Sequence, residues 1–191
     1  MSDKKRWPAA DAIKVADELL AALWFFCERI EVAGSLRRKR AMVGDVEVLY
    51  VPAIETRKVD MFTNGDFNTA EEAIAELLAS GIISKRPNIA PHYTWGALNK
   101  LAIHCASGIP VDMFATTANH FPMSLVIRTG PKDFNFRLIA GAEKRGFKVH
   151  AYDHGSGAFT EIATGRNVYP ETEKAVLRMA GLDWIEPEHR L

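Results

Sequence analysis

The sequence is short of cysteine, of net charge and of long apolar runs. Its 191 residues include two cysteines, and 24 basic side chains balance 24 acidic ones, so the formal net charge is zero. Cys27 and Cys105 lie in apolar stretches without the spacing of a metal site, as expected of reduced thiols in a cytoplasmic protein. Zero net charge excludes a uniformly basic nucleic-acid binder, so attraction for phosphate must come from local patches.

No leading apolar segment and no apolar run of 18 residues occurs, so the sequence predicts neither a signal peptide nor a membrane span. At 48% hydrophobic residues, the chain can bury a core as one medium domain or two small ones.

Residues 31–51 read EVAGSLRRKRAMVGDVEVLYV and organise the rest of the chain. Apolar residues alternate with others on both sides of this stretch, which predicts two short β-strands. These alternating residues are Ile30, Val32, Val46, Val48 and Tyr50. The loop between them holds the pair Gly34-Ser35 and a basic patch at residues 37–40.

Asp45 and Glu47 stand two residues apart on the second predicted strand. Because successive strand side chains point to opposite faces, both carboxylates leave the sheet on one side while Val46 and Val48 enter the core. Two anions this close repel each other unless a cation lies between them. Magnesium is bound by carboxylates where a substrate phosphate supplies further ligands, and Gly34 lies where that phosphate would arrive.

The spacing of these residues resembles a known signature. Gly-Ser, nine residues, then Asp-Val-Glu-Val is similar to the polymerase-beta-like nucleotidyltransferases, and GSLRR followed by GDVE resembles family X DNA polymerases in particular. An acidic pair alone is typical of a half-buried strand. The resemblance rests on the pair together with Gly34, Ser35, Arg37, Arg38 and Gly44.

The family places a third carboxylate on a neighbouring strand, and Asp112 matches it. Residues 100–116 form two alternating runs about Ser107-Gly108, which predicts a β-hairpin. The expected inward set is Leu101, Ile103, Cys105, Val111 and Met113. Asp112 would then lie on the opposite face, and His104 would be a solvated strand residue.

Helical patterns lie on either side of the acidic strand. Residues 7–27 predict an amphipathic helix whose apolar face is Ile13, Ala16, Leu20, Leu23, Trp24 and Cys27, and we expect the aromatic run at residues 24–26 to pack in the core. Asn64-Gly65-Asp66 predicts a turn. A second helix is expected over residues 71–79, capped by Asn68 or Thr69.

Two domains are expected, a catalytic palm over residues 1–117 and a carboxy-terminal subdomain over residues 118–191. In residues 125–147, the resemblance implies that a Thr129-Gly130 turn leads into the helix that closes over the incoming nucleotide. Near the end, residues 155–157 suit a hairpin tip, and residues 171–173 open a helix.

The resemblance implies an α/β (α+β) fold, with a mixed sheet backed by helices and a small carboxy-terminal α/β subdomain. It implies a template-using DNA polymerase that fills short gaps in repair, acts on gapped or primer-template DNA with nucleoside triphosphates, and works as a monomer away from membranes. Two Mg²⁺ ions, or Mn²⁺, would be bound by Asp45, Glu47 and Asp112, the three catalytic carboxylates. The implied nucleotide-binding residues are Gly34, Ser35, Arg38, Gly44, Thr129, Gly130 and Asn135.

The resemblance covers nearly the whole chain and is nearest to the shortest, viral-type members. Only six residues precede Trp7, so we expect neither the amino-terminal lyase domain nor the helix-hairpin-helix region of larger members.

Three positions depart from the family pattern. Glu47 stands where Asp is usual, which affects metal preference. Ile127 and Arg128 replace the aromatic residues before Thr-Gly, so sugar selection does not carry over. Ile139 replaces a template-contacting arginine, and we therefore expect low fidelity.

Two alternatives stay open at this point. One is a nucleotidyltransferase that modifies RNA or protein, and the other is a palm that binds nucleotide without transferring it.

Overall fold

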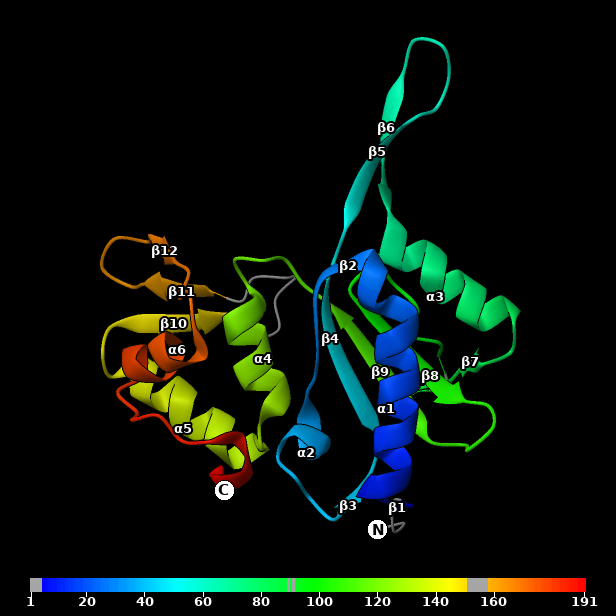
Figure 1. The fold of residues 1–191 in the computed structure, drawn as a ribbon. Coiled ribbons are helices and arrows are strands. Elements are labelled where there is room, and N and C mark those ends of the chain that lie inside the picture. The colour runs from blue at the N-terminus through cyan, green and yellow to red at the C-terminus, as the bar shows by residue number, and fades with distance from the viewer. Residues whose placement is uncertain (1–4, 89, 91, 151–157) are drawn as a thin grey trace.

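The computed structural model describes residues 5–88, 90, 92–150 and 158–191, which form two lobes joined side by side (Figure 1). The hairpin tip expected at residues 155–157 lies outside this range. The strands are β1 (Trp7–Pro8), β2 (Cys27–Val32), β3 (Met42–Val43), β4 (Val46–Pro52), β5 (Ile54–Lys58), β6 (Asn64–Asn68), β7 (Ile83–Lys85), β8 (Asn99–His104), β9 (Pro110–Ala115), β10 (Phe147–His150), β11 (Ala158–Glu161) and β12 (Asn167–Val168). The α-helices are α1 (Ala9–Leu23), α2 (Gly34–Arg37), α3 (Thr69–Ala79), α4 (Phe121–Thr129), α5 (Lys132–Glu143) and α6 (Glu173–Met179).

The first lobe is built on a five-stranded sheet in the order β2-β4-β9-β8-β7. β4 and β9 run parallel, and the other neighbouring pairs are antiparallel. The mixed sheet backed by helices confirms the predicted fold class. In this register Glu47 of β4 lies directly beside Asp112 of β9.

β4 is buried on both faces, because different helices cover its two sides. Val46, Val48 and Tyr50 join the main core with residues of α1 and α3. Leu49 and Val51 face the other way, against a smaller cluster that includes residues of α4. Glu47 alternates with Val46 and Val48, so its side chain leaves the sheet on the α4 side. The strand thus aims this carboxylate at the second lobe.

Helix α1 is shorter and turned differently from the sequence prediction. It begins at Ala9 and ends at Leu23, and a 3₁₀ turn over Trp24–Phe26 leads into β2. The predicted face was wrong in part, since Ile13 and Trp24 are exposed while Ala12, Val15 and Leu19 are buried. Phe25 is 88% exposed, because the helix ends before the aromatic run reaches the core.

The predicted hairpin of β8 and β9 is confirmed, but the inward face of β8 was assigned wrongly. Lys100 and Ala102 lie opposite Met113 and Val111 and are buried with them. His104 is also buried, contrary to the expected solvated position; its Nε2 lies 3.2 Å from Oε2 of Glu18. The opposite set, which includes Leu101, shares a face with Asp112.

Asn64-Gly65-Asp66 is not a turn but the start of β6, and β5 and β6 form a hairpin that projects from the first lobe (Figure 1). The turn lies at the hairpin tip, where the Asp60 carboxylate accepts hydrogen bonds from the backbone N–H groups of Phe62 and Thr63. The predicted cap of α3 is confirmed, because the Asn68 side chain accepts from the Glu71 N–H at 3.1 Å.

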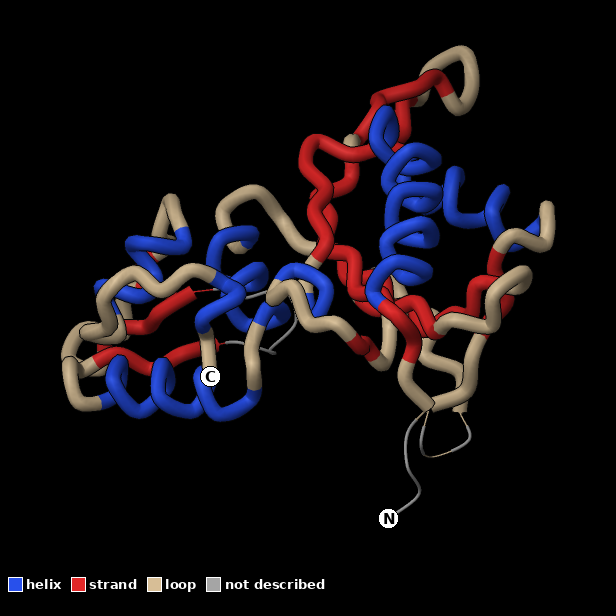
Figure 2. The backbone as a smooth tube through the Cα atoms, turned by 60° about the horizontal axis from the view of Figure 1, so that its bottom comes forward, coloured by secondary structure: helices blue, strands red, loops and turns tan. Residues whose placement is uncertain are grey.

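The second lobe has its own core, formed by α4, α5, α6 and the three-stranded sheet β10-β11-β12. Thr172 caps α6, with its hydroxyl accepting from the Ala175 N–H at 3.1 Å. α4 also packs against β4, so it bridges the two lobes. Figure 2 shows the two lobes from a second direction. The predicted boundary at residue 117 falls between β9 and α4 and stays a prediction.

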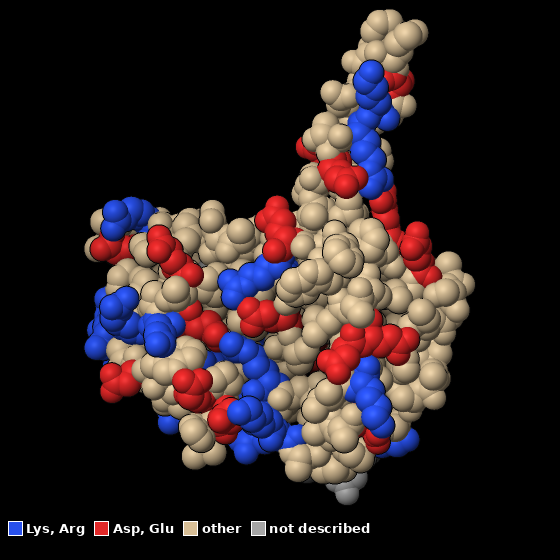
Figure 3. All heavy atoms as spheres, viewed as in Figure 1, with Lys and Arg blue, Asp and Glu red and all other residues tan. Residues whose placement is uncertain are grey.

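Acidic and basic side chains are interspersed over the face drawn in Figure 3, in keeping with the zero net charge. Among the described helices, none is long and apolar enough to cross a membrane.

A buried ion pair ties α3 to the sheet. The Lys100 side chain is 2% exposed, and its ammonium group donates to the Glu71 carboxylate and to the Gly96 carbonyl. We expect Glu71→Gln to lower the free energy of unfolding by about 2–3 kcal/mol, because it leaves a buried ammonium without its anion; the Glu71 side chain is itself 36% exposed, which moderates the loss. Urea unfolding measures this.

Glu72→Gln is the matched control, since Glu72 shares the first turn of α3 but pairs with Arg57 at the surface. Its loss should stay below about 1 kcal/mol. Equal losses in the two variants would contradict the role assigned to the buried pair.

Candidate active site

Glu47 lies against the backbone of Gly34, where β2 ends. The Ala33 N–H donates to the Glu47 carbonyl at 2.8 Å, which holds this turn onto β4. Gly34 has φ +63°, and a Cβ at this position would lie 2.5 Å from Glu47 Oε1. Only glycine allows so close an approach without displacing the carboxylate. The glycine of the Gly-Ser pair therefore makes room for an acid, which sequence reasoning had not anticipated.

The electrostatics of Glu47 reflect two neighbouring acids. Burial, followed by the charges of Asp45 and Asp112, raises the pKa of the Glu47 carboxyl to about 7. Arg128 and Arg38 act in the opposite direction and lower the pKa. This carboxyl therefore keeps its proton to a higher pH than a surface glutamate does, as expected of a partly desolvated acid beside like charges.

Asp112 is paired with a cation from the edge of the sheet. The Arg86 guanidinium donates to its carboxylate, and Arg86 Nε lies 3.3 Å from the Ala102 carbonyl. In the described ranges, no three His, Cys, Asp or Glu side chains gather as a ready set of metal ligands.

The donor chemistry nevertheless fits a divalent cation. All three acids offer hard oxygen atoms, and the charges of Asp45 and Asp112 add to burial in raising the pKa of Glu47, which Arg128 and Arg38 oppose only in part. A cation between them would relieve this repulsion. Their assignment as metal ligands stays a prediction.

Arg38 reaches the second lobe. One terminal nitrogen donates to the Thr129 carbonyl, while its Nε is buried and has no hydrogen-bond acceptor among the described residues. Burial lowers the pKa of this guanidinium, and Glu47 and Asp45 partly oppose the shift. A buried N–H without an acceptor is costly, so the group is suited to bind an anion.

Arg37, the neighbour of Arg38, ties α2 to α6. Its two terminal nitrogens bind the two carboxylate oxygens of Glu173 at 2.8 and 2.6 Å, and one also donates to Thr129 Oγ1 at 3.0 Å. Fully buried Arg190 approaches the same carboxylate at 3.5 Å. Thr129 is therefore held by two consecutive arginines, one on its side chain and one on its carbonyl.

Arg128 lies over the sheet and not in open solvent. Its guanidinium stacks 3.5 Å from the centroid of the Phe114 ring and donates to Asn99 Oδ1 at 3.3 Å. Both partners belong to the first lobe, although Arg128 itself lies in the last turn of α4.

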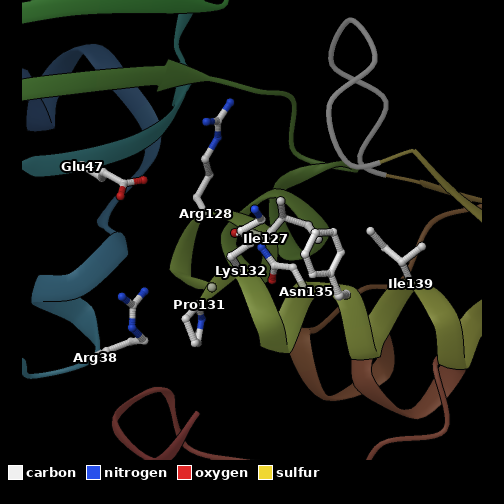
Figure 4. A pocket seen from close by; sticks show the side chains of 10 residues that line it. Arg38, Glu47, Ile127, Arg128, Pro131, Lys132, Asn135 and Ile139 are labelled. Atoms are coloured by element: carbon white, nitrogen blue, oxygen red, sulfur yellow. Dashed lines mark hydrogen bonds between the residues drawn. The ribbon is translucent and has the colours of Figure 1, made fainter. Parts of the chain in front are cut away.

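A cavity of about 500 Å³ opens between the lobes (Figure 4). Arg38 and Glu47 enter it from the first lobe, and α5 supplies Lys132 and Asn135 from the opposite side. The remaining lining residues are Ile127, Arg128, Gly130, Pro131, Phe136 and Ile139. One part of the cavity is thus charged and another is apolar.

The cavity brings together four of the predicted site residues: Arg38, Glu47, Gly130 and Asn135. Asp45, Asp112, Gly34, Ser35, Gly44 and Thr129 do not line it. Asn135 is buried, and its amide nitrogen donates to the Ile127 carbonyl at 2.8 Å. The predicted turn is present, with Thr129 ending α4 and Gly130 at φ +61°.

Sequence reasoning missed Arg86, Phe136 and the Arg37–Glu173 pair. Arg86 falls in a stretch without a clear period, so nothing in the sequence placed it beside Asp112. Phe136 could have been found from its place directly after Asn135 on the predicted nucleotide helix. In the structure its side chain is 56% exposed.

The comparisons with known proteins agree with this geometry. Residues 124–191 match the family model described as DNA polymerase beta thumb. No curated protein matches the chain. The matched range contains α5, α6 and the sheet β10-β11-β12, and thus most of the second lobe. The matched thumb and the mixed sheet agree with the resemblance of the sequence to polymerase-beta-like proteins of family X.

Proposed function

We propose that the protein is a template-using DNA polymerase that adds nucleoside monophosphates to a primer 3′-hydroxyl and releases pyrophosphate. The observation that carries this proposal is the pairing of Glu47 with Asp112 on adjacent parallel strands, facing a thumb of the polymerase beta type. Short gaps in DNA are the proposed substrate, and repair is the proposed context. A thumb of this type favours polymerisation over modification of RNA or protein.

The two parts of the cavity suit the two ends of a nucleoside triphosphate. Arg38 offers the planar fork that matches phosphate oxygens, and its buried Nε lacks an acceptor among the described residues. The apolar part, with Phe136 and Ile139, suits a base. The Gly130 backbone also lines the cavity and would contact the sugar. Ser35 and Gly44 lie on either side of Arg38 in the sequence and would contact phosphate.

Asp45 and Glu47 would hold two Mg²⁺ ions, with Mn²⁺ as a possible substitute, and Asp112 would hold the one on the hydroxyl side. Bound Mg²⁺ would supply charge neutralisation and activation of the hydroxyl. The protein's own residues orient the triphosphate and keep the acids close together. With Ile139 in place of an arginine, we propose low fidelity, and we propose that the enzyme acts as a monomer.

The proposed role of Asp112 can be tested by substitution. We expect Asp112→Asn to abolish primer extension on gapped DNA while changing triphosphate affinity less than about threefold, because Asp45 and Glu47 remain to hold the nucleotide side. Extension assays beside a fluorescent-nucleotide titration separate the two effects. Asp66→Asn, on the distant β5–β6 hairpin, is the control.

Substantial extension by Asp112→Asn would remove this residue from the catalytic set. No extension by the unaltered protein on gapped DNA would refute the proposed function itself.

The Glu47 pKa of about 7 predicts that metal binding depends on pH. A cation binds the ionised carboxylate, so protonation below pH 7 should compete with it. We expect the Mg²⁺ concentration for half-maximal extension to rise about tenfold per pH unit below 7 and to level off above about pH 8. Titrations from pH 6 to 8.5 measure this, and a flat profile would contradict the assignment of Glu47 as a ligand.

The position of Arg128 predicts weak selection between deoxyribose and ribose nucleotides. Arg128 is stacked on Phe114 of the palm, so no aromatic wall stands at this position to exclude a 2′-hydroxyl. We expect discrimination against ribonucleotides of less than about a hundredfold, the scale reached by shape alone. Arg128→Phe should increase this ratio by about tenfold or more, measured as relative incorporation efficiency of matched nucleotides.

Arg128→Gln separates loss of the arginine from gain of a ring and should leave the ratio low. A natural preference for deoxynucleotides above about a thousandfold, unchanged in Arg128→Phe, would show that backbone at Gly130 excludes the hydroxyl instead.

A further inference from the structure

Arg86 pairs with a proposed catalytic acid, Asp112, but belongs to no motif recognised in the sequence. Its side chain is 24% exposed and that of Asp112 is 17% exposed, so the ion pair between them is largely shielded from water. A charge-assisted bond in such a position is stronger than a surface pair, because solvent and salt screen it less.

The sheet itself holds Arg86 in place. Its backbone N–H donates to the Leu101 carbonyl at 2.9 Å, and its Nε lies 3.3 Å from the Ala102 carbonyl. Leu101 is the direct neighbour of Asp112 in the β8–β9 register. The guanidinium is therefore anchored to the strand next to Asp112 and reaches across it to the carboxylate.

The acids of the site thus have different internal cations. Arg128 and Arg38 favour the ionised form of Glu47, whereas Arg86 bonds directly to Asp112. Since Glu47 and Asp112 are side by side, neutralising one also reduces the repulsion on the other. The two proposed metal positions therefore have unequal ligands. Only one of them depends on Asp112, the acid that already pairs with Arg86.

We propose that Arg86 is a positioning residue that holds Asp112 in place and competes with a divalent cation for it. The inference rests on the proposed function, since it takes Asp112 as a ligand. The cation that depends on Asp112 is then held more weakly than the one held by Asp45 and Glu47. Binding it requires Arg86 to release or share the carboxylate.

Mn²⁺ binding to the full chain, without DNA or nucleotide, tests this. Free Mn²⁺ is followed by electron paramagnetic resonance at pH 8, where Glu47 is mainly ionised. We expect two classes of site, with the weaker class absent in Asp112→Asn. In Arg86→Gln the weaker class should bind about tenfold more tightly, as expected when a charge-assisted hydrogen bond no longer competes.

Arg86→Lys keeps the charge and should stay within about threefold of the unaltered protein, which separates competition by charge from loss of packing. Arg57→Gln is the matched control, because Arg57 pairs with Glu55 and Glu72 away from this site, and its Mn²⁺ affinity should not change. If Arg86→Gln does not fold, Arg86→Met keeps the buried stem and serves as the second neutral variant.

Unchanged or weaker Mn²⁺ binding in a folded neutral variant would overturn the proposal, and so would a weaker site that survives Asp112→Asn. A purely structural Arg86 would lower thermal stability and leave Mn²⁺ affinity unchanged. Because the measurement needs no catalysis, a protein that fails to extend primers but shows the expected Mn²⁺ shift would refute polymerisation while supporting the role of Arg86.

Discussion

The register between β4 and β9 is the constraint on which this structure depends. It places Glu47 beside Asp112 on a face that α4 and the thumb partly cover, so two like charges meet with little water to separate them. Neighbouring residues accommodate the carboxylates in two ways. Gly34 gives the Glu47 carboxylate room, while Arg38, Arg128 and Arg86 supply positive charge.

A second consequence concerns the two lobes. Consecutive arginines at the end of α2 connect the proposed phosphate site to the thumb: Arg37 binds Glu173 and the Thr129 hydroxyl, and Arg38 binds the Thr129 carbonyl. The bidentate pair of Arg37 with Glu173 is largely shielded from water, so it is a stronger link between the lobes than the single bond from Arg38 to a carbonyl.

The burial of β4 on both faces explains why an acid can be placed there at all. Apolar neighbours on each side fix the strand, and α4 packs on the outer face beside the position of Glu47. The cost is a carboxyl whose pKa is raised to about 7, first by burial and then by the charges of Asp45 and Asp112.

The sequence by itself determined the acidic strand, the Gly-Ser loop, the hairpin that carries Asp112 and the Thr129-Gly130 turn, because each depends on a period of two or on a local motif. It could not determine which face of β8 is buried, because the polar residues Lys100 and His104 alternate with the apolar Leu101 and Ile103. The face of Lys100 and His104 is the inner one, since Glu71 of α3 pairs with Lys100 and Glu18 of α1 lies beside His104. The pairing of Arg86 with Asp112 was likewise decided by tertiary structure. A contact across 26 residues leaves no periodic trace in the chain, because it arises only when the strands assemble in register.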